Sequence, residues 1–411
     1  MCYQTLLALQ RASRFFLSLI LLASVLKPVD DTRMLGKFAR TLADAGARVA
    51  VAGRASTASP LPAGISQHPI FSGARLSRGR LAAQARYWRL LGQLRPALVI
   101  VHAPELLPLT LLWRALGRGR QFMYDIRENY ALNVSTQGIY RGLARRALAA
   151  GLRWVEALAS RRAAALTLAE ESYAAELPFL QLVPASRVVV LENKYQPAPG
   201  EQLPRASRAL PTPDEPLRLL FSGTISDLNG VREAITLAHN LNKTWPGGAE
   251  LTIIGFCQQR ELLGYLHVLL EQLSASGNLF ITLEGGAEPV PHARIVAAMS
   301  RAHLGLLPYR PHPSTERCRP TKLFEYLAHC LPVLVPANPL WVKTVHAHGA
   351  GLVVDFTDAA QAAAEVAAAL PAADFYPAGR PGEVLWASEG KKLRHLLESL
   401  GLGPTFAAPF A

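Results

Sequence analysis

Cysteine and charge are both scarce in this chain of 411 residues. Its four cysteines form no C-x-x-C pair and have no ligand spacing with histidine, which argues against a disulfide scaffold and a structural zinc site. Charged residues make up 18% of the chain and hydrophobic residues 50%, so the composition excludes a disordered protein. We therefore expect a folded protein of two or three domains with free thiols in a reducing compartment.

Long hydrophobic runs are also lacking, because no apolar stretch reaches the roughly 20 residues of a membrane-spanning helix. The most apolar segment, Phe15 to Leu26, follows Arg11 and Arg14, as the apolar core of a secretory signal would. No A-x-A-like cleavage site with an obvious mature start follows it. A buried strand is the favoured interpretation, with a secretory signal as the alternative, and the expected location is cytoplasmic.

The motifs of several common enzyme classes are missing. The chain contains no G-x-G-x-x-G, G-x-x-x-x-G-K-[ST], G-x-S-x-G or H-E-x-x-H pattern, so dehydrogenase, P-loop and hydrolase functions lose their main support. The pair Asp30-Asp31 is not a D-x-D metal site, and capping of a helix N-terminus is its favoured role. We expect no metal site.

The charge that is present is unevenly distributed. Residues 1–210 carry 28 basic and 12 acidic residues, whereas residues 211–411 carry 15 and 18. A basic half suits nucleic acid, anionic lipid or a phosphorylated substrate, but no nucleic-acid recognition motif is present, so nucleic acid is not an expected partner. Four arginines near two large apolar residues suit either a membrane face or a solvated surface: Arg145, Arg146, Arg161 and Arg162, with Trp154 and Leu158.

Short apolar runs alternate with longer helical patterns in both halves, as in parallel sheets covered by helices. The strands expected in the first half are 18–26, 49–52, 97–102, 121–124, 164–167 and 188–191. Those expected in the second half are 217–221, 250–254, 279–283, 304–307, 332–335 and 351–354, with helices from Val231, Arg260, His292 and Pro320. The fold class predicted is α/β, with two tandem Rossmann-like, doubly wound domains that face a cleft.

Sequence rich in Pro and Ser between Gln196 and Pro216 has almost no apolar periodicity, so it predicts the domain boundary. We expect a first domain over 15–200, a linker over 201–216, a second domain over 217–385 and a C-terminal helix over 386–402.

The strongest local pattern begins at Pro320, which suits the first position of a helix. Lys322, Glu325 and His329 then form a polar stripe that starts at the helix N-terminus, where unpaired N–H groups, the helix dipole and the lysine charge favour a phosphate. Glu325 lies one turn further in and could accept hydrogen bonds from the vicinal hydroxyls of a ribose. The alternative is an ordinary amphipathic helix with a solvated Lys–Glu pair.

This segment resembles the P-x-K-x-x-E-Y-[LM]-A-x-x-[LK]-P-[VI] stretch of retaining glycosyltransferases of the GT-B fold, in particular family 4. Other stretches resemble parts of the same enzymes in the same order, over most of the chain. They are Lys27 to Arg33 in the first loop, Glu105 to Pro108, Tyr124 to Glu128, Asn193 at the end of the acceptor domain, Phe221 to Gly230 in the loop opening the donor domain, and Trp386 to Leu400 in a helix returning to the first domain.

The resemblance implies hexosyl transfer with retention of configuration from a nucleotide-sugar co-substrate to a glycan or lipid-linked acceptor, with no metal or other cofactor. The residues expected to be catalytic are Lys322, Glu325, Arg127 and Glu128. Those expected to bind the donor are Gly223, Thr224, Asn229, Arg317, Arg319, Pro320, Thr321, Lys322 and Glu325. Those expected on the acceptor side are Lys27, Asp31, Arg33 and Glu105.

The chain departs from the family pattern at four positions. Arg317 stands eight residues before Glu325, where the first glutamate of an E-x(7)-E pair is usual, and Asn229 replaces a basic residue. Arg127 replaces the histidine of the YD-x-HE stretch, and Cys330 replaces a helix-ending glycine, where a left-handed conformation would cost about 1 kcal/mol. A non-catalytic carbohydrate- or partner-binding protein and a sugar-nucleotide epimerase are therefore kept as alternatives. The basic half adds the hypothesis of peripheral docking on the inner face of the cytoplasmic membrane.

Overall fold

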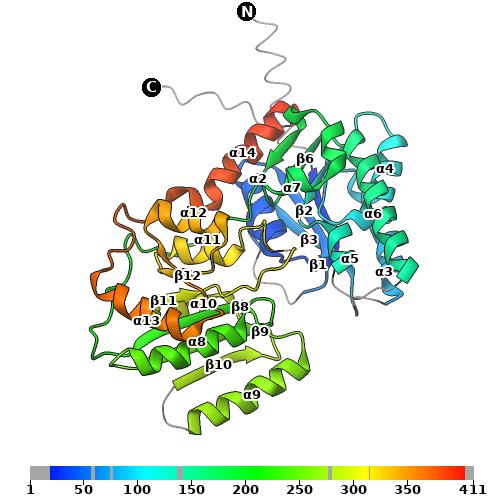
Figure 1. Ribbon diagram of the computed structural model, residues 1–411. Helices are drawn as coiled ribbons and strands as arrows, with labels where there is room; N and C mark the ends of the chain where they lie inside the picture. The colour runs from blue at the N-terminus through cyan, green and yellow to red at the C-terminus, as the bar shows by residue number, and fades with distance from the viewer. Residues whose placement is uncertain are drawn as a thin grey trace, which may run out of the picture. The chain divides into compact units, whose positions relative to one another are not determined.

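The computed structural model describes residues 19–56, 61–74, 77–136, 142–275, 280–313 and 315–402 (Figure 1). The chain divides into two compact units, one made of Met1–Gln196 with Trp386–Ala411 and the other of Pro197–Leu385. Each unit contains one sheet of parallel strands with helices. The predicted α/β class with two Rossmann-like, doubly wound domains is confirmed.

The sheet of the first unit has seven strands in the order β3-β2-β1-β4-β5-β6-β7. They are β1 (Leu19–Pro28), β2 (Arg48–Arg54), β3 (Ile65–Phe71), β4 (Leu98–Val101), β5 (Gln121–Ile126), β6 (Ala165–Leu168) and β7 (Val188–Val190). The order reverses between β1 and β4, and ligands of such sheets bind at the carboxyl ends of the strands beside this switch point.

Helices cover both faces of this sheet. One face carries α3 (Gly79–Leu94), α4 (Leu107–Ala115) and α6 (Gly142–Arg162), and the other carries α2 (Arg40–Asp44), α14 (Trp386–Ser399) and the π-helical segment η1 (Thr32–Ala39). Alternate residues of β1 point to opposite faces, so Leu21 joins the core under α3, α4 and α6, while Ile20 and Leu22 join the core under η1 and α14. Burial on both faces explains why β1 is an almost continuous apolar run.

The remaining elements of the first unit are short connections. They are η2 (Pro104–Leu106), α5 (Tyr130–Thr136), α7 (Tyr173–Glu176), η3 (Pro178–Leu182) and η4 (Ala185–Arg187).

The helix α14 belongs to the first unit, although it follows the second unit in sequence. Trp386 donates from Nε1 to Thr41 Oγ1 at 2.9 Å, and Glu389 pairs with Lys194 Nζ at 2.6 Å. These contacts fix the C-terminal helix against α2 and the segment that follows β7.

The second unit has six parallel strands in the order β10-β9-β8-β11-β12-β13, which reverses between β8 and β11. Its strands are β8 (Leu217–Thr224), β9 (Ala249–Phe256), β10 (Phe280–Gly286), β11 (Leu304–Leu306), β12 (Val333–Val335) and β13 (Gly351–Val353). Its helices are α8 (Val231–Thr244), α9 (Arg260–Ala275), α10 (His292–Arg301), α11 (Thr321–Ala328), α12 (Pro339–His348), α13 (Ala359–Ala369) and the short turns η5 (Leu370–Ala372) and η6 (Gly382–Val384).

All twelve predicted strands are present within a few residues of their expected bounds. The apolar stretch predicted from Phe15 forms β1 from Leu19 onward, and residues 15–18 lie outside the described residues. The structure adds β3, which the sequence analysis missed. This strand lies at the sheet edge and contains Pro69, which a central strand does not tolerate, so its sequence does not read as a strand.

Residues 201–216, the expected linker, form no helix or strand but pack against the second unit. Arg208 donates to the carbonyl of Ser300 at 3.1 Å, and Arg205 O accepts from the N–H of Arg380 at 3.1 Å. This segment is therefore hydrogen bonded along its length. Among the described residues, no helix is both long and apolar enough to cross a membrane.

Candidate functional site

Three glycines form a row across the carboxyl ends of neighbouring strands in the second unit. Gly223 of β8 pairs in register with Gly255 of β9, which pairs with Gly285 of β10. All three have positive φ, and a Cβ on Gly255 would lie 1.7 Å from the carbonyl oxygen of Gly223. Only glycine fits there, so the row presents bare backbone beside the switch point of this sheet.

The helix α11 starts beside this row. Pro320 is its N-cap residue, one position earlier than predicted, and its side chain cannot cap the N–H groups of the first turn. Tyr326 on the buried face of α11 contacts Ser222, with Tyr326 Oη 2.9 Å from Ser222 Oγ and 3.2 Å from the Ser222 nitrogen. Because Ser222 directly precedes Gly223, this contact fixes the start of the helix next to the glycine row.

Lys322 crosses directly over Gly223, since a Cβ added to that glycine would lie 2.7 Å from Lys322 Cε. Its ammonium pairs with Glu325 Oε2 at 2.5 Å, and His292 Nε2 of α10 lies 3.7 Å from Glu325 Oε1. Burial alone would raise the pKa of Glu325, but the nearby Lys322 charge, with His292, holds it at about 2. Although Glu325 is only 7% exposed, this low pKa keeps it an ionised acceptor at neutral pH. The predicted Lys322–Glu325 stripe thus lies against the glycine row.

The other residues expected to bind the donor lie on the two loops around this point. Asn229 donates from Nδ2 to the carbonyl of Thr224 at 2.8 Å, so its amide holds the loop between β8 and α8. Arg317 is exposed before α11, and the Arg319 guanidinium lies 5.8 Å from the centroid of the Phe324 ring. Glu316, which misses the family register by one residue, is also exposed. Both arginines directly precede α11 in sequence.

Cys330 has the left-handed conformation expected at the end of α11, with φ of 48°. The N–H of Leu331 bonds to Tyr326 O at 2.9 Å and that of Cys330 to Leu327 O at 3.2 Å, which is the pattern of a Schellman motif. The motif keeps its geometry without the usual glycine, at the predicted cost of about 1 kcal/mol.

In the first unit, Asp31 caps the start of η1, as expected from the sequence. Its Oδ1 accepts from the N–H groups of Arg33 and Met34 at 3.0 and 2.9 Å. The same carboxylate forms a bidentate pair with Arg127, at 2.9 and 3.1 Å. Arg127 therefore ties the end of β5 to the start of η1, in the place where the family motif has histidine.

A fully buried polar network lies beneath this pair. Arg33 makes a bidentate pair with Asp125 at 2.8 and 2.7 Å and donates to the carbonyl of Leu191 at 2.9 Å. Asp125 also accepts from Thr167 Oγ1 at 2.7 Å and lies 2.8 Å from His102 Nδ1. Arg33 is 1% exposed, so this residue, expected on the acceptor side, is committed to the interior. Burial lowers the pKa of His102, which keeps the imidazole neutral.

A pocket of about 610 Å³ opens at the carboxyl ends of β1, β4 and β5, beside the switch point of the first sheet. Three residues named from the sequence line it: Lys27, Glu105 and Glu128. Lys27 Nζ pairs with Glu128 Oε1 at 3.2 Å, and Glu105 Oε2 pairs with Arg80 at 3.1 Å. Burial raises the pKa of Glu128, but the Lys27 charge outweighs it and leaves the pKa below its ordinary value. We call this space the acceptor-side pocket.

Several residues of these sites escaped the sequence analysis. They are Gly255 and Gly285 in the donor half and Arg54, Arg80 and His102 in the acceptor-side pocket. Gly255 and Gly285 follow two predicted strands within one and two residues, and this position is a signal that was present in the sequence. Arg54 and Arg80 carried no such signal, because they reach the pocket from strands and helices distant in sequence. Within the described residues, no cluster of three or more His, Cys, Asp or Glu is placed to hold a metal ion.

Comparison with known proteins gives one family match and several structures of similar fold. Residues 32–194 match the model of the glycosyl transferase 4-like domain. Sucrose-phosphate synthase from Thermosynechococcus elongatus superposes with a TM-score of 0.64 at 16% identity, over 93% of this chain and 99% of that one. HepE from Anabaena, in complex with UDP and glucose, gives 0.60 at 13% identity over 93% and 100%. WaaG, a glycosyltransferase involved in lipopolysaccharide biosynthesis, gives 0.57 at 16% over 93% and 98%.

No curated protein matches the chain at a significant level of sequence similarity. The solved structures share its two-sheet fold at low identity, and the family match covers most of the first unit, including η1 and the lining of the acceptor-side pocket from Arg54 onward. Residues 32–194 therefore resemble the glycosyl transferase 4-like domain, and the chain as a whole has the two-domain GT-B fold.

Proposed function

We propose that the chain transfers a hexose from a nucleotide-sugar donor, with retention of configuration, to a glycan or lipid-linked acceptor. The observation that carries this proposal is Lys322 lying over Gly223 at the uncapped start of α11, with ionised Glu325 one turn further in. Backbone N–H groups, a helix dipole and a fixed cation together suit a diphosphate. A buried carboxylate beside them suits the two hydroxyls of a ribose.

The chemistry needs stabilisation of a leaving group. When the bond between the sugar and the phosphate breaks, negative charge grows on the departing diphosphate while the sugar becomes oxocarbenium-like. Lys322 and the first turn of α11 are placed to receive that charge, so the proposed mechanism uses no metal ion. Glu325 holds the ribose and takes no proton, in keeping with its low pKa. HepE from Anabaena, which is similar in fold, forms complexes with UDP and UDP-glucose, and this supports a nucleoside diphosphate as part of the proposed donor.

The acceptor is proposed to enter the acceptor-side pocket of the first unit. Its walls combine the charged groups of Arg54, Arg80 and Glu128 with the apolar side chains of Leu148 and Leu152 on α6. Polar groups suit the hydroxyls of a sugar, and the apolar wall suits a sugar ring face or a lipid carrier. Glu128 is proposed to contact the reacting acceptor group. Arg127 is proposed to hold Glu128 in place, because its own pair with Asp31 fixes the neighbouring backbone.

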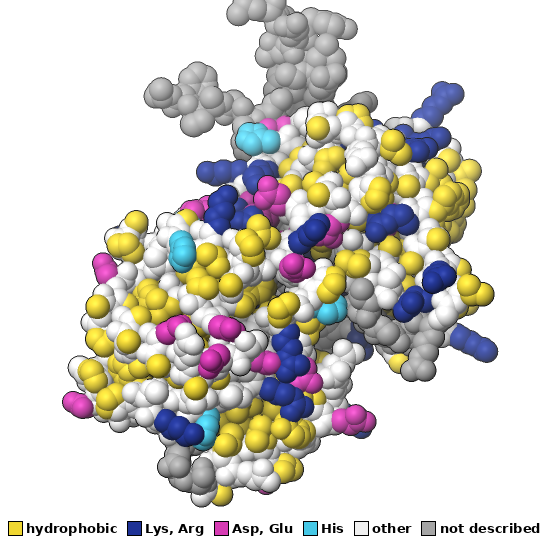
Figure 2. Space-filling model, viewed as in Figure 1, with side chains coloured by type: hydrophobic (Ala, Val, Ile, Leu, Met, Phe, Trp, Pro, Cys, Tyr) yellow, Lys and Arg dark blue, Asp and Glu magenta, His cyan; other side chains and the backbone are white. Residues whose placement is uncertain are grey.

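Membrane association is proposed through the outer surface of α3, α4 and α6, which we call the arginine-rich face. These three helices contain a single acidic residue, Glu156, and it is fully buried. Figure 2 shows basic and hydrophobic side chains interspersed over these helices. The most exposed large apolar residues there are Leu81, Leu112, Leu116, Leu143 and Trp154, with exposed fractions of 75, 47, 63, 81 and 67%. Exposed apolar groups among arginines suit the headgroup region of an anionic membrane on the cytoplasmic side.

The arginine-rich face is expected to bind phosphatidylglycerol vesicles. The double substitution Arg161→Gln with Arg162→Gln removes two exposed charges, each worth about 1 kcal/mol near an anionic surface, so partitioning should fall about 30-fold. The matched control is Arg260→Gln with Arg301→Gln, two exposed arginines of the second unit. Vesicle flotation measures both. Vesicle binding that does not change with the charge of the lipid or with rising salt concentration would contradict the proposal.

The donor is tested by measuring hydrolysis of UDP-, ADP-, GDP- and dTDP-sugars together with the thermal shift each produces. One donor is expected to stabilise the protein by about 2.7 kcal/mol at 100 times its dissociation constant and to be hydrolysed slowly. Stabilisation with no hydrolysis, and no transfer to any glycan or lipid acceptor, would favour a non-catalytic binding protein. A changed sugar configuration in the released nucleotide sugar would favour an epimerase.

A further inference from the structure

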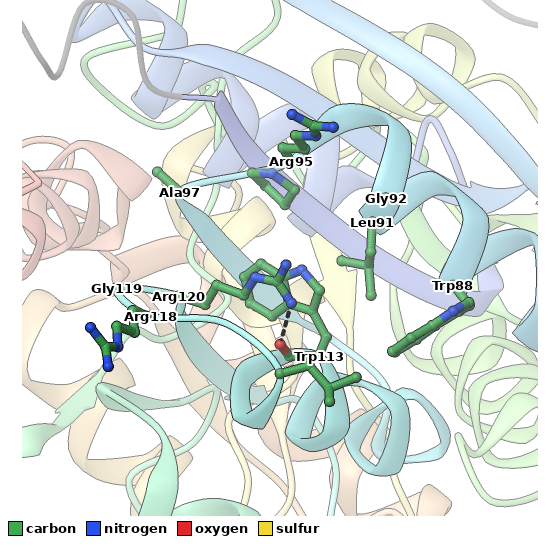
Figure 3. A pocket seen from close by; sticks show the side chains of 11 residues that line it. Trp88, Leu91, Gly92, Arg95, Ala97, Trp113, Arg118, Gly119 and Arg120 are labelled. Atoms are coloured by element: carbon green, nitrogen blue, oxygen red, sulfur yellow. Dashed lines mark hydrogen bonds between the residues drawn. The ribbon is translucent and has the colours of Figure 1, made fainter.

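A second pocket of the first unit lies at the amino ends of the strands, whereas the acceptor-side pocket lies at their carboxyl ends. It has a volume of about 590 Å³ and is formed by the end of α3, the start of β4 and the loop from α4 to β5 (Figure 3). Ala97 in its wall donates its N–H to Leu19 O at the start of β1, at 2.9 Å. The pocket therefore faces away from the strand ends that carry the proposed chemistry.

The lining of this pocket is strongly cationic. It includes Arg95, Arg118 and Arg120 and no acidic residue. The C-termini of α3 and α4 also point here, and each contributes roughly half a negative charge, so about two positive charges remain. Glu105, the one acidic residue between Trp88 and Arg120 in the sequence, follows the other end of β4 and pairs with Arg80. An anion is the ligand that this lining favours.

One of the three arginines is held in a fixed position. Arg120 donates to the carbonyl of Trp113 at 2.6 Å, and its guanidinium lies 5.2 Å from the centroid of the Trp113 ring. Gly117 permits this approach, because a Cβ there would lie 2.3 Å from Arg120 Nε. In Figure 3, Arg120 lies near the centre, with Arg95 above it and Arg118 to its left. A fixed, planar cation flanked by two exposed ones suits the several oxygens of a phosphate.

The rim of the pocket is apolar and continues the arginine-rich face. Trp88 and Leu116 line the pocket and are 38 and 63% exposed, and Leu112 on the same helix α4 is 47% exposed. A phosphate in free solution would gain nothing from these side chains. An amphiphile would cover these apolar side chains with its own apolar part while its phosphate reaches the arginines. Indole rings take such positions at the membrane interface.

We propose that this pocket binds the phosphate headgroup of an anionic phospholipid, with Arg95, Arg118 and Arg120 on the phosphate and Trp88 and Leu116 against the glycerol and acyl region. This site deepens the membrane association proposed above and lies outside the donor and acceptor pockets. It gives the arginine-rich face one specific lipid contact in addition to its diffuse charge.

The test uses monomeric dihexanoyl phosphatidylglycerol below its micelle concentration, with the full chain and calorimetric titration. Saturable binding is expected, at least 10-fold tighter than that of dihexanoyl phosphatidylcholine or inorganic phosphate. Arg95→Gln with Arg118→Gln should weaken it at least 10-fold, because both side chains are exposed and their loss leaves the core intact. Arg260→Gln with Arg301→Gln makes the same charge change in the second unit and should leave the affinity within 2-fold.

Three results would overturn the proposal: no saturable binding, equal binding of inorganic phosphate or the zwitterionic lipid, or equal binding by the Arg95/Arg118 variant. Equal binding of inorganic phosphate would identify a site for a free anion. The assay contains neither vesicle nor donor, so its outcome is separate from those of vesicle flotation and donor hydrolysis. If the Arg95/Arg118 variant binds vesicles and titrates with the short-chain lipid as the unsubstituted protein does, the specific site is ruled out. Membrane binding would then depend only on the diffuse charge of the arginine-rich face.

Discussion

Replacing Lys322 by alanine is expected to lower kcat/KM for the nucleotide-sugar donor by about 10²- to 10³-fold. The ammonium lies over Gly223 at the start of α11, and removing one fixed group that stabilises a developing charge costs about 3–4 kcal/mol in the transition state. Glu325→Ala should cost about 10²-fold, because it removes charge-assisted hydrogen bonds to the ribose hydroxyls. Initial rates of transfer and donor hydrolysis measure both effects.

The controls for these two substitutions are Lys391→Ala and Glu261→Ala, which remove the same side chains from exposed positions on α14 and α9. They should change kcat/KM less than 2-fold. The pH profile supplies a second check. Because the folded pKa of Glu325 is about 2, below its ordinary value of 4.5, its ionised form stabilises the fold above pH 4.5 and this contribution is lost as the pH falls toward 2. An activity loss near pH 6 that disappears in Glu325→Gln would contradict the assignment.

Replacing Asp125 by alanine is expected to lower the free energy of unfolding by about 3–5 kcal/mol. The substitution leaves the Arg33 guanidinium, 1% exposed, without the bidentate partner that now neutralises it. It also removes the acceptor of Thr167 and the partner of His102. Because whole domains are stable by only about 5–15 kcal/mol, the first unit should melt at a much lower temperature. Urea denaturation followed by circular dichroism measures the change.

Two further variants serve as comparisons for Asp125→Ala. Asp44→Ala removes an exposed carboxylate at the end of α2 and should change stability by less than about 0.5 kcal/mol. Thr167→Ala removes one hydrogen bond of the same network and should cost about 1–2 kcal/mol. If Asp125→Ala lowers stability no more than Thr167→Ala does, the buried Arg33 guanidinium does not need Asp125 to neutralise its charge. The role assigned to Asp125 in the network would then be wrong.

Local patterns predicted most of the fold. The apolar runs marked every strand except β3, and Pro320 marked the start of α11 to within one residue. The positive φ of Cys330 was also predictable, because it takes the place of a helix-ending glycine. These features depend on neighbours within a few residues, which is the range over which a sequence pattern carries information.

The polar network of the first unit was not predictable in the same way. Arg33 resembles a surface residue in sequence, and only the sheet order brings it to Asp125, 92 residues later. The same limit applies to the row formed by Gly223, Gly255 and Gly285, whose register comes from strand pairing. Motifs thus indicated the candidate site residues, whereas the partners that orient them come from contacts between distant segments.

A crystal structure of the protein with a nucleoside diphosphate that stabilises it would locate the donor site. We expect the diphosphate within hydrogen-bonding distance of Lys322 and the first turn of α11, above Gly223, with the ribose hydroxyls on Glu325. A nucleotide bound at any other place, with the Lys322–Glu325 pair unchanged and out of its reach, would contradict the account.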